Sequence, residues 1–581
     1  MEFEDVVRRP FGTLIGGAFK AFFGLWLLLL PFALGSEVGH RLQRAVLTPN
    51  LPHDVTGALA LALVPALAFF LVARAVGRRR ANGAGAGSGA HGSATWGSGR
   101  ELVTPSGLVL GRQLRGRPGT RRRPGRKTGP LLRYDGPGHV LTVAPTRSGK
   151  GVGAVVPNLL AHPGALVVTD PKGENYAVTA RHRRRAGHDV QALDPFDVVG
   201  GGAAFNPLDA LDPAGLDAAD DAAMIADMLV VPRPGASGDS AFWDTEAKAL
   251  LAGLVLHVAA EERGAKRSLP HVRELLTLPP EAFAELLKTM EASRKAHGLV
   301  ARAAARLRQK SDKERSGVVS SAQNHTHFLD SPRMRRVLSR STFDLAALKR
   351  PTGRAGVGGD GAPTAGAADG AAGLLSLYVV IPPDRLDSYR GWVRLVVASS
   401  LLAVSRTPGQ PRHRVLFLLD EFAQLGPMLP VLRAYSLLAG YGAQIWLFLQ
   451  DLSQLRMTYR EAWGSFLANA DVLQAFGTND HETAALLSKM LGDATVLSAN
   501  AGDNRGSSQG FGLPSFNRGR STGHTETGRP LLTPDEVRRL PADEQVLFVR
   551  GGAPVLARRL RYYEDAAFRG LHDPNPTLAP A

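Results

Sequence analysis

The stretch "LTVAPTRSGKGVGAVVPNLL", residues 141–160, constrains the fold of this chain more than any other stretch. An apolar, β-rich run at 139–145 leads into a glycine-rich loop, and a segment with helical character follows. A strand, a loop and a helix in this order form a phosphate-binding loop, whose backbone N–H groups and lysine face the phosphates. The sequence therefore predicts a nucleotide site in which Lys150 reaches the β- and γ-phosphates. The residues expected to cradle the phosphates are Thr146, Arg147, Ser148, Gly149, Lys150 and Gly151.

Two positions of this loop depart from the usual pattern G-x-x-x-x-G-K-[ST]. Ala144 replaces the first glycine, which matters little where the backbone φ is negative. Gly151 replaces the serine or threonine whose hydroxyl normally binds Mg²⁺, so a water in its place would hold the metal less tightly. The loop alone is compatible with a working nucleotide site, an inactive one or a glycine-rich turn.

A second motif, "RVLFLLDEFAQLG" at 414–426, favours the working site. Its continuous apolar run is typical of a strand buried on both faces, and the run ends in two adjacent acids. We expect Asp420 to hold Mg²⁺ and Glu421 to polarise the attacking water. Adjacent carboxylates also occur by chance at strand ends, but the combination with the loop at 141–151 makes chance a poor explanation.

Further strands are predicted, and polar residues stand at their ends. The run "AQIWLFLQDLSQL", 443–455, reaches Gln450, which we expect to sense the γ-phosphate; the alternative is a capping glutamine without a catalytic part. Strands are also expected within 164–174 and 376–386. Strands that alternate with helices predict an α/β fold with a doubly wound, mostly parallel sheet.

The charge of the chain points to a polyanionic partner. The 581 residues carry a formal net charge of +17, which suits nucleic acid or an acidic membrane surface. A solvated, arginine-rich surface is the alternative. The chain has no cysteine, which excludes disulfides, thiolate metal sites and a cysteine nucleophile.

Two apolar runs near the N-terminus, at about 11–35 and 55–75, are long enough to span a bilayer, which takes roughly 20 residues. Basic residues flank the pair on the outer sides, at Arg8, Arg9 and 78–80, so the positive-inside rule places both ends in the cytoplasm. A cleaved signal peptide does not account for the second run. Two buried helices of a soluble core remain the other interpretation.

The anchor predicted at 1–80 is followed by a flexible basic linker over 81–130. Within it, "RQLRGRPGTRRRPGRK" at 112–127 suits phosphate binding, contact with anionic lipid or a solvated loop equally. Two low-complexity insertions, 353–373 and 499–528, are expected to be surface loops.

With these motifs in hand, the chain resembles the TraG-like coupling proteins of type IV secretion systems, which are the membrane ATPases of bacterial conjugation. The resemblance covers nearly the whole chain, and the "GKG" ending of the loop is familiar in this branch of the family. The motifs that carry it are "APTRSGKGVGAVVPNLL" at 144–160, "DPKGENY" at 170–176, "LDPF" at 193–196, "FNPL" at 205–208, "FWDTEAKALLAGLVLHV" at 242–258, "LYVVIPPDRL" at 377–386, "LLDEFAQLG" at 418–426, "AGYGAQIWLFLQDLSQL" at 439–455 and "RPLLTPDEVRRLP" at 529–541.

The resemblance implies a RecA-like P-loop NTPase domain at 131–207 and 346–581, interrupted by an all-α domain at 208–345. Helical spacing of apolar residues over 242–258 agrees with the interruption. The resemblance further implies ATP and Mg²⁺ as cofactors and a homo-hexameric ring at the bacterial inner membrane. Single-stranded DNA, a relaxase or effector cargo, and inner-membrane secretion components are the implied partners.

An arginine from the neighbouring subunit commonly completes such a site, and Arg433 and Arg456 are the candidates. His325, His327 and His481 show no metal-ligand spacing and are expected to be structural or solvent-facing. Three other functions compete with the coupling ATPase: a cargo receptor with weak or no hydrolysis, an ATPase for protein-effector export, and a septal double-strand DNA translocase.

Overall fold

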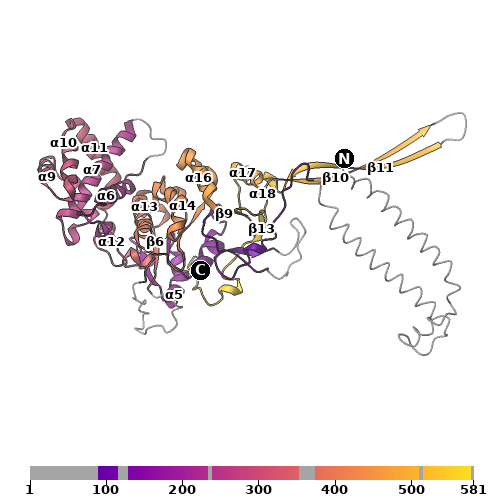
Figure 1. Ribbon diagram of the computed structural model, residues 1–581, viewed down its shortest axis with the longest axis horizontal. Coiled ribbons are helices and arrows are strands. Elements are labelled where there is room, and N and C mark those ends of the chain that lie inside the picture. Colours follow the sequence, from indigo (N-terminus) through magenta and orange to yellow (C-terminus); the bar gives the residue numbers. More distant parts are fainter. Residues whose placement is uncertain (1–88, 115–128, 233–238, 352–372, 509–514, 578–581) are drawn as a thin grey trace, which may run out of the picture. The chain divides into compact units, whose positions relative to one another are not determined.

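The computed structural model describes residues 89–114, 129–232, 239–351, 373–508 and 515–577. The chain forms two compact units, of which residues 92–494 with 529–581 make the larger. That unit is built on an 11-stranded sheet with the order β2-β1-β13-β12-β9-β3-β8-β7-β4-β6-β5 (Figure 1). Its strands are β1 (Leu108–Gln113), β2 (Leu131–Tyr134), β3 (His139–Val143), β4 (Leu166–Asp170), β5 (Asp189–Leu193), β6 (Leu375–Val380), β7 (Val415–Leu419), β8 (Ala443–Leu449), β9 (Ala470–Ala475), β12 (Glu544–Val549) and β13 (Val555–Arg558).

The part of the sheet from β9 to β5 is parallel throughout. Val143 at the end of β3 lies opposite Leu449 at the end of β8, and Leu419 of β7 lies opposite Leu447 of β8. The carboxyl ends of these strands therefore meet at one edge of the sheet. This register brings together the segments that follow β3, β7 and β8, where the sequence placed its candidate site residues.

The central strands are buried on both faces. Every residue of β3, β4, β6, β7 and β8 is buried, which explains their continuous apolar sequence. On one face Leu141 packs in the same core as Val396 and Val431 from helices α13 and α14, and on the other Val140 packs with Leu159 of α4. The strands predicted within 139–145, 164–174, 376–386, 414–419 and 443–449 are confirmed.

Helices account for the rest of this unit. Between β5 and β6 the described residues contain helices and short turns but no strand. These helices are α6 (Ala218–Leu229), α7 (Asp239–Glu261), α8 (Leu269–Leu276), α9 (Pro280–Ala292), α10 (Leu299–Arg308), α11 (Asp312–Thr326) and α12 (Pro332–Leu338). The others are α4 (Val156–Ala161), α5 (Glu174–Arg185), α13 (Pro383–Arg406), α14 (Leu429–Leu437), α15 (Leu452–Tyr459), α16 (Gly464–Asn469), α17 (His481–Leu491) and α18 (Pro534–Arg538).

Helix α7 lies at the centre of the helical segment and contacts α6, α8, α10 and α11 (Figure 1). The predicted helical face, which includes Ala247, Leu250 and Leu254, is buried. Val255 and Leu256 are buried as well, because neighbours pack on several sides of this helix. Helices α9 and α12 cover most of the stretches "LPPEAFAELLKTM" and "PRMRRVLSRS".

The remaining strands of the large sheet, β12, β13, β1 and β2, pair antiparallel. Strand β1 falls inside the range that the sequence analysis assigned to a flexible linker, 81–130. Its apolar core, 108–110, is too short to stand out beside the basic stretch that follows. Arg112, counted with that basic stretch, forms an ion pair of 2.5 Å with Asp565, and residues 115–128 lie outside the described residues.

The expectation of a surface loop over 499–528 is wrong, because β10 (Asp493–Ser508) and β11 (Ser515–Pro530) pair in a two-stranded sheet. Backbone hydrogen bonds form a ladder whatever the side chains are, so the Gly- and Ser-rich composition conceals these strands. Most of the other insertion, 353–373, and both predicted spans, 11–35 and 55–75, lie outside the described residues. Among the residues that are described, no helix has the length and apolar character needed to cross a bilayer.

Candidate nucleotide-binding site

The phosphate-binding loop connects β3 to a helix that begins with a wide, π-type turn, η3 (Gly151–Val155), and continues as α4. Arg147 and Gly149 adopt positive φ angles of 60° and 84°, whereas Ala144 is not among the described residues with positive φ. The replacement of the first glycine by Ala144 therefore costs the backbone little. Thr146 and Arg147 are exposed, whereas Lys150 is only 7% exposed and points into the molecule.

Lys150 meets the acid pair that follows β7. Its Nζ lies 2.9 Å from Oε1 of Glu421 and 3.4 Å from Oδ1 of Asp420. Burial lowers the pKa of Lys150, but the charges of Asp420 and Glu421 together outweigh burial and the net pKa is raised. The lysine is therefore charged at neutral pH, and the two carboxylates balance its charge. Lys150 and Glu421 are 271 positions apart in the chain, and they meet in space as the sequence predicts.

Glu421 is held on both carboxylate oxygens. Oε1 accepts from Lys150, while Oε2 accepts from Gln450 at 2.7 Å and from Gln424 at 3.0 Å. Its backbone has a φ of 52°, which is uncommon for a residue other than glycine and typical of functional positions. Gln450 thus lies beside the acid pair, as expected. Gln424, in the turn η9 (Phe422–Leu425), was not predicted.

Strand β4 supports the acid pair from the neighbouring position in the sheet. The Thr169 hydroxyl accepts from the backbone N–H of Asp420 at 2.7 Å. Burial raises the pKa of Asp420, and the positive charge of Lys150 opposes that effect. Asp170, at the end of β4, is fully buried, and burial with the charges of Glu174 and Asp420 raises its pKa to about 7. Thr169 and Asp170 were not assigned a role from the sequence.

An arginine from the C-terminal part of the chain lies against the outer side of the loop. Arg559 donates from Nη2 to the carbonyl of Ser148 and from Nη1 to the carbonyl of Ala542 at 2.5 Å. Its guanidinium stacks over the Phe476 ring at 4.2 Å. Burial lowers the pKa of Arg559 to about 10, so the side chain stays protonated. A cavity of about 660 Å³ opens here, lined by residues that include Arg147, Gly149 and Arg559.

The two arginines proposed for a neighbouring subunit, Arg433 on α14 and Arg456 on α15, are both exposed. In the described part of the chain, the ion pairs of Asp420 and Glu421 are with Lys150 rather than with either arginine. This placement leaves both side chains available to another molecule. Their role stays a prediction. Of the histidines, His325 pairs with Asp244 at 2.9 Å in the helical segment.

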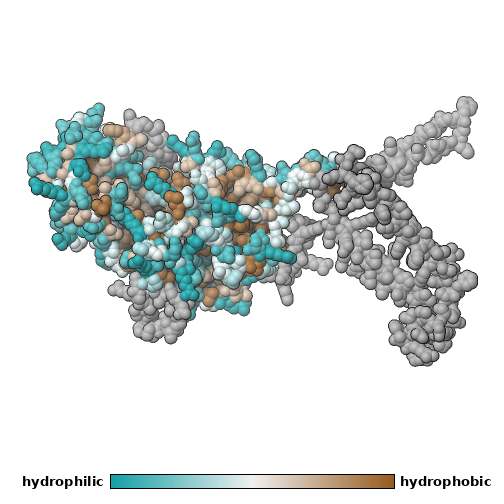
Figure 2. Space-filling model, in the orientation of Figure 1, coloured by the Kyte–Doolittle hydropathy of each residue, from teal (hydrophilic) through white to brown (hydrophobic). Residues whose placement is uncertain are grey.

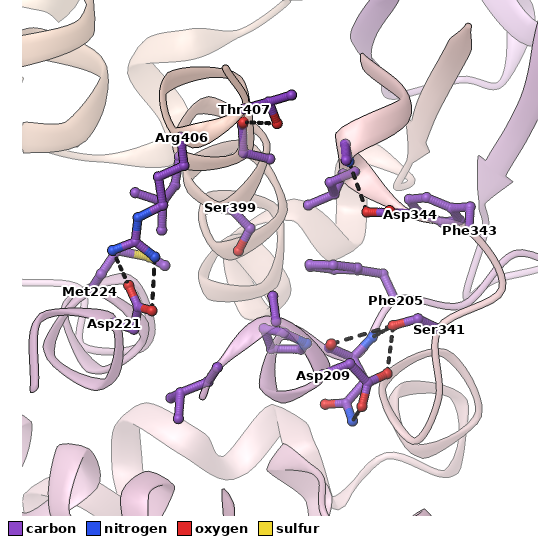
Figure 3. Close-up of a pocket in the computed structure, with 18 of the residues that line it drawn as sticks. Phe205, Asp209, Asp221, Met224, Ser341, Phe343, Asp344, Ser399, Arg406 and Thr407 are labelled. Atoms are coloured by element: carbon purple, nitrogen blue, oxygen red, sulfur yellow. Dashed lines mark hydrogen bonds and ion pairs between the residues drawn. The ribbon is translucent and has the colours of Figure 1, made fainter. Parts of the chain in front are cut away.

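A second cavity, of about 620 Å³, lies between the helical segment and α13 (Figure 3). Arg406 of α13 pairs with Asp221 of α6 at 2.7 Å at one side, and the Ser341 hydroxyl donates to Asp209 at 2.8 Å at the other. Its described lining comes from α6, α13 and the turns η4 (Pro207–Ala210) and η8 (Leu345–Leu348). The described lining of this cavity contains no residue of the phosphate-binding loop, so the cavity is separate from the candidate nucleotide site.

Comparison with known proteins gives a consistent result. Residues 103–357 and 370–579 match the family described as "Type IV secretory system Conjugative DNA transfer". The conjugal transfer protein TraG of Escherichia coli is 31% identical over 467 residues, which cover 75% of this chain and 69% of TraG. VirD4 of Agrobacterium fabrum is 28% identical over 462 residues, which cover 75% of this chain and 60% of VirD4.

Solved structures of the plasmid coupling protein TrwB share the fold. The complex with the non-hydrolysable ATP analogue ADPNP superposes with a TM-score of 0.56 at 17% identity, covering 81% of this chain and 93% of TrwB. The complex with ADP and Mg²⁺ gives a TM-score of 0.53 at 17% identity, covering 82% and 97%. The chain therefore has a mixed α/β fold of the P-loop NTPase type, with a largely parallel sheet.

Proposed function

Because the chain belongs to the family of type IV secretory system proteins for conjugative DNA transfer, we propose that it is a coupling ATPase. It binds ATP and uses hydrolysis to drive DNA, or a relaxase–DNA conjugate, into a type IV secretion channel. The observation that carries this proposal is the contact of Lys150 with Asp420 and Glu421 across the carboxyl edge of the sheet. A nucleotide bound by the loop would place its terminal phosphate between these groups.

The residues present suit a nucleotide with its Mg²⁺. TrwB, which shares the fold, has been solved with ADPNP and with ADP and Mg²⁺. In this chain the loop amides and Lys150 would hold the phosphates, and the Asp420 carboxylate supplies the hard oxygen ligand that Mg²⁺ prefers. Bound there, Mg²⁺ neutralises charge on the phosphates. Asp170 adds a buried carboxylate oxygen that has no hydrogen-bond partner among the described residues.

Hydrolysis follows from the position of Glu421. With nucleotide bound, the Lys150 ammonium turns from Glu421 to the phosphate oxygens, which leaves Oε1 free to orient the attacking water and accept its proton. Gln450 contacts the other oxygen of the same carboxylate, so a change at the phosphate reaches β8 and α15 through one side chain. That contact supports Gln450 as the residue that reports loss of phosphate.

We extend the proposal to the assembly. Of the exposed apolar residues, Leu429 and Leu437 lie on α14 with Arg433, and Met457 lies on α15 with Arg456. Tyr441 lies in the short turn that follows α14. On the face seen in Figure 2, hydrophobic residues are scattered among hydrophilic ones over the described part of the chain. A neighbouring copy seated on α14 and α15 would cover those four side chains and bring its own site within reach of an arginine. A homo-hexameric ring, anchored in the inner membrane by 11–35 and 55–75, is the proposed form.

The remaining parts of the proposal concern cargo and domains. The net charge of +17 favours a phosphate-rich cargo, held through its backbone without sequence readout. We propose the division into an anchor at 1–80, a linker at 81–130, a nucleotide-binding domain at 131–207 and 346–581, and an all-α domain at 208–345. The all-α domain would face the cytoplasm and select the relaxase or effector.

A mating assay tests the proposal with the full-length protein. We expect Lys150→Ala and Glu421→Gln to lower DNA transfer by at least about a hundredfold, because each removes a group on which hydrolysis depends. Immunoblots of membrane fractions establish equal amounts of protein. Lys288→Ala and Glu285→Gln are matched controls, since both side chains are exposed on α9.

The outcomes separate the competing functions. Wild-type transfer by Lys150→Ala would support a passive cargo receptor and contradict the ATPase. ATP turnover by the detergent-solubilised full chain, with single-stranded and double-stranded DNA in parallel, distinguishes the coupling protein from a double-strand translocase. Export of a protein substrate without DNA transfer by the wild type would identify an effector-export ATPase.

A further inference from the structure

The loop lacks one of the usual ligands of the nucleotide-bound metal. In phosphate-binding loops of this kind, a serine or threonine hydroxyl directly after the lysine binds Mg²⁺. Here that position is Gly151, which has no side chain. The carboxylates named so far for the metal are Asp420, which follows β7, and Asp170, which ends β4, and neither belongs to the loop. Another oxygen near Gly151 would have to complete the set.

The structure places a carboxylate oxygen at this position. A Cβ built on Gly151 would lie 3.7 Å from Oε1 of Glu174, the nearest described heavy atom outside the loop's own chain neighbours and helix. A serine at this position would carry its hydroxyl one bond beyond that Cβ. Glu174 Oε1 therefore borders the place that a serine hydroxyl occupies in the usual loop.

The second carboxylate oxygen of Glu174, Oε2, is hydrogen-bonded to residues near the C-terminus. It is the first residue of α5, directly after Gly173, whose φ of 69° turns the chain out of the "DPKG" segment. Oε2 accepts from the Thr577 hydroxyl at 2.9 Å and from Nδ2 of Asn575 at 3.3 Å. Hydrogen bonds of this kind orient carboxylates that ligate metals.

A second observation at the same place points to a cation. Asp170 is fully buried, and its Oδ1 has no hydrogen-bond partner among the described residues, while Oδ2 accepts from the backbone N–H of Tyr176 at 2.9 Å. Asp170 lies close enough to Glu174 and Asp420 for both charges to act on it. A buried carboxylate oxygen without a partner is rare in folded proteins, and a cation nearby offsets its cost.

We propose that Glu174 takes the place of the missing hydroxyl and, together with Asp420, holds the Mg²⁺ of the bound nucleotide. The ligand atom is Oε1, which reaches the metal directly or through one water. This inference rests on the proposed nucleotide site. The "GKG" loop is then complete, because the ligand that is missing after the lysine is supplied by the segment that follows the neighbouring strand β4.

The test measures metal binding rather than turnover. Full-length protein in detergent is titrated with Mn²⁺ in the presence of ADP, and bound Mn²⁺ is followed by electron paramagnetic resonance. We expect Glu174→Gln, which keeps the shape and the acceptor for Thr577, to weaken Mn²⁺ binding by about tenfold to a hundredfold. Binding of ADP in EDTA should stay within twofold of the wild type, which also shows that the loop is folded.

A rescue variant tests whether positions 151 and 174 can supply a ligand to the same coordination position of the metal. Gly151→Ser is free of close contacts, since the one heavy atom near its Cβ is 3.7 Å away. Added to Glu174→Gln, it should restore most of the Mn²⁺ affinity. Absence of any gain in the double variant would overturn the inference, as would a Glu174→Gln affinity within twofold of the wild type.

Two controls test whether the effect is specific to Glu174 and whether the proposed nucleotide site is present. Asp573→Asn breaks the ion pair of Asp573 with Arg181, 2.5 Å long, and loosens the C-terminal segment without touching Glu174. If it weakened Mn²⁺ binding as much as Glu174→Gln does, the effect would belong to the segment and the inference would fail. If the wild type and Lys150→Ala bound ADP equally, the proposed nucleotide site itself would be at fault.

Discussion

At the scale of single residues, the two carboxylate oxygens of Glu421 have different partners. One oxygen contacts Lys150, which we propose binds the phosphates, and the other contacts Gln450, directly after β8. Hydrogen bonds to both oxygens fix the orientation of the carboxylate. Removing either partner changes its orientation without changing the fold.

We expect Gln450→Ala to lower the turnover number for ATP by about tenfold to a hundredfold, because the carboxylate loses the donor that orients it. The dissociation constant for ADP should change little, since Gln450 is not expected to touch the phosphates directly. Steady-state ATPase measurements and equilibrium binding of a fluorescent ADP check the two parts. Gln424→Ala removes the other donor and serves for comparison. Equal loss of ADP binding in Gln450→Ala would contradict the assigned role.

Arg559 leads to a different expectation. Its guanidinium donates to the Ser148 carbonyl and stacks on Phe476, so it fixes the loop from outside. Arg559→Ala should weaken ADP binding by about tenfold or more, because a charged hydrogen bond at the loop is lost. Arg561→Ala is the matched control, since Arg561 is exposed and pairs with Glu564 at 2.9 Å. An unchanged affinity in Arg559→Ala would show that the loop does not depend on this contact.

The same residues show how far the sequence reaches. Lys150 was predicted from the glycine-rich loop that follows an apolar run, and Asp420, Glu421 and Gln450 from the ends of two further apolar runs. The parallel strands bring these segments to one edge of the sheet. Arg559 was missed because it lies in "LARRLRYYED", where arginines are common and no spacing marks one of them. Its partner is a backbone carbonyl, which leaves no trace in the sequence.

At the scale of elements, a buried arginine joins α13 to two other segments. Arg394 is 2% exposed and donates to the carbonyls of Asp227 and Met228, at the end of α6, and to those of Leu425 and Pro427, after the acid pair. Burial lowers the pKa of Arg394 to about 10, so the guanidinium keeps its charge. One side chain thus connects the helical segment to the chain that follows Glu421.

We expect Arg394→Met to destabilise the protein by about 3 kcal/mol or more, because several buried carbonyls lose their donor at once. Thermal unfolding of the full-length protein in detergent measures the change. Arg390→Met, on the same helix, is the control, since Arg390 is partly exposed and its contact with Asp387 is 3.7 Å long. Similar melting of both variants would mean that the bridge made by Arg394 contributes little.

Helices and strands also differ in how readily they can be predicted from the sequence. Strands β3, β7 and β8 were predicted because they are buried on both faces and therefore apolar without interruption. The apolar part of β1, 108–110, is short and borders a basic stretch, and β10 and β11 consist largely of polar and small residues. Such strands are specified by their backbone pairing, which for β10 and β11 is with each other.

At the scale of the whole molecule, stability depends on histidines that fold in the neutral form. Burial lowers the pKa of His139 to about 4, of His162 to about 3 and of His188 to about 2. In the unfolded chain these groups bind protons near pH 6.5, so the unfolded state gains protons that the folded state does not. Stability is therefore lost as the pH falls below about 6.5. Asp170, whose pKa is raised to about 7, and Asp420, whose pKa is also raised by burial, act in the opposite direction against the three histidines.

We expect the unfolding midpoint to fall markedly between pH 7.5 and pH 5. His139 alone accounts for up to about 3 kcal/mol at pH 4, at about 1.4 kcal/mol per unit of pKa shift. His139→Asn keeps an acceptor for the Ile445 N–H, which lies 3.0 Å from Nδ1, and should make the midpoint less sensitive to acid. Denaturation curves at several pH values, for both proteins without nucleotide, check this. An identical acid dependence would assign the loss to other groups.

The contacts of the C-terminal segment bear on when the protein first becomes active during its synthesis. Lys150 leaves the ribosome long before the acid pair, and Arg559, Asn575 and Thr577 emerge after both. Until then the loop lacks the arginine that fixes it, and Glu174 lacks the residues that orient it. Under the proposed function, a nascent chain that has not yet added this segment would hold nucleotide poorly and would not hydrolyse it.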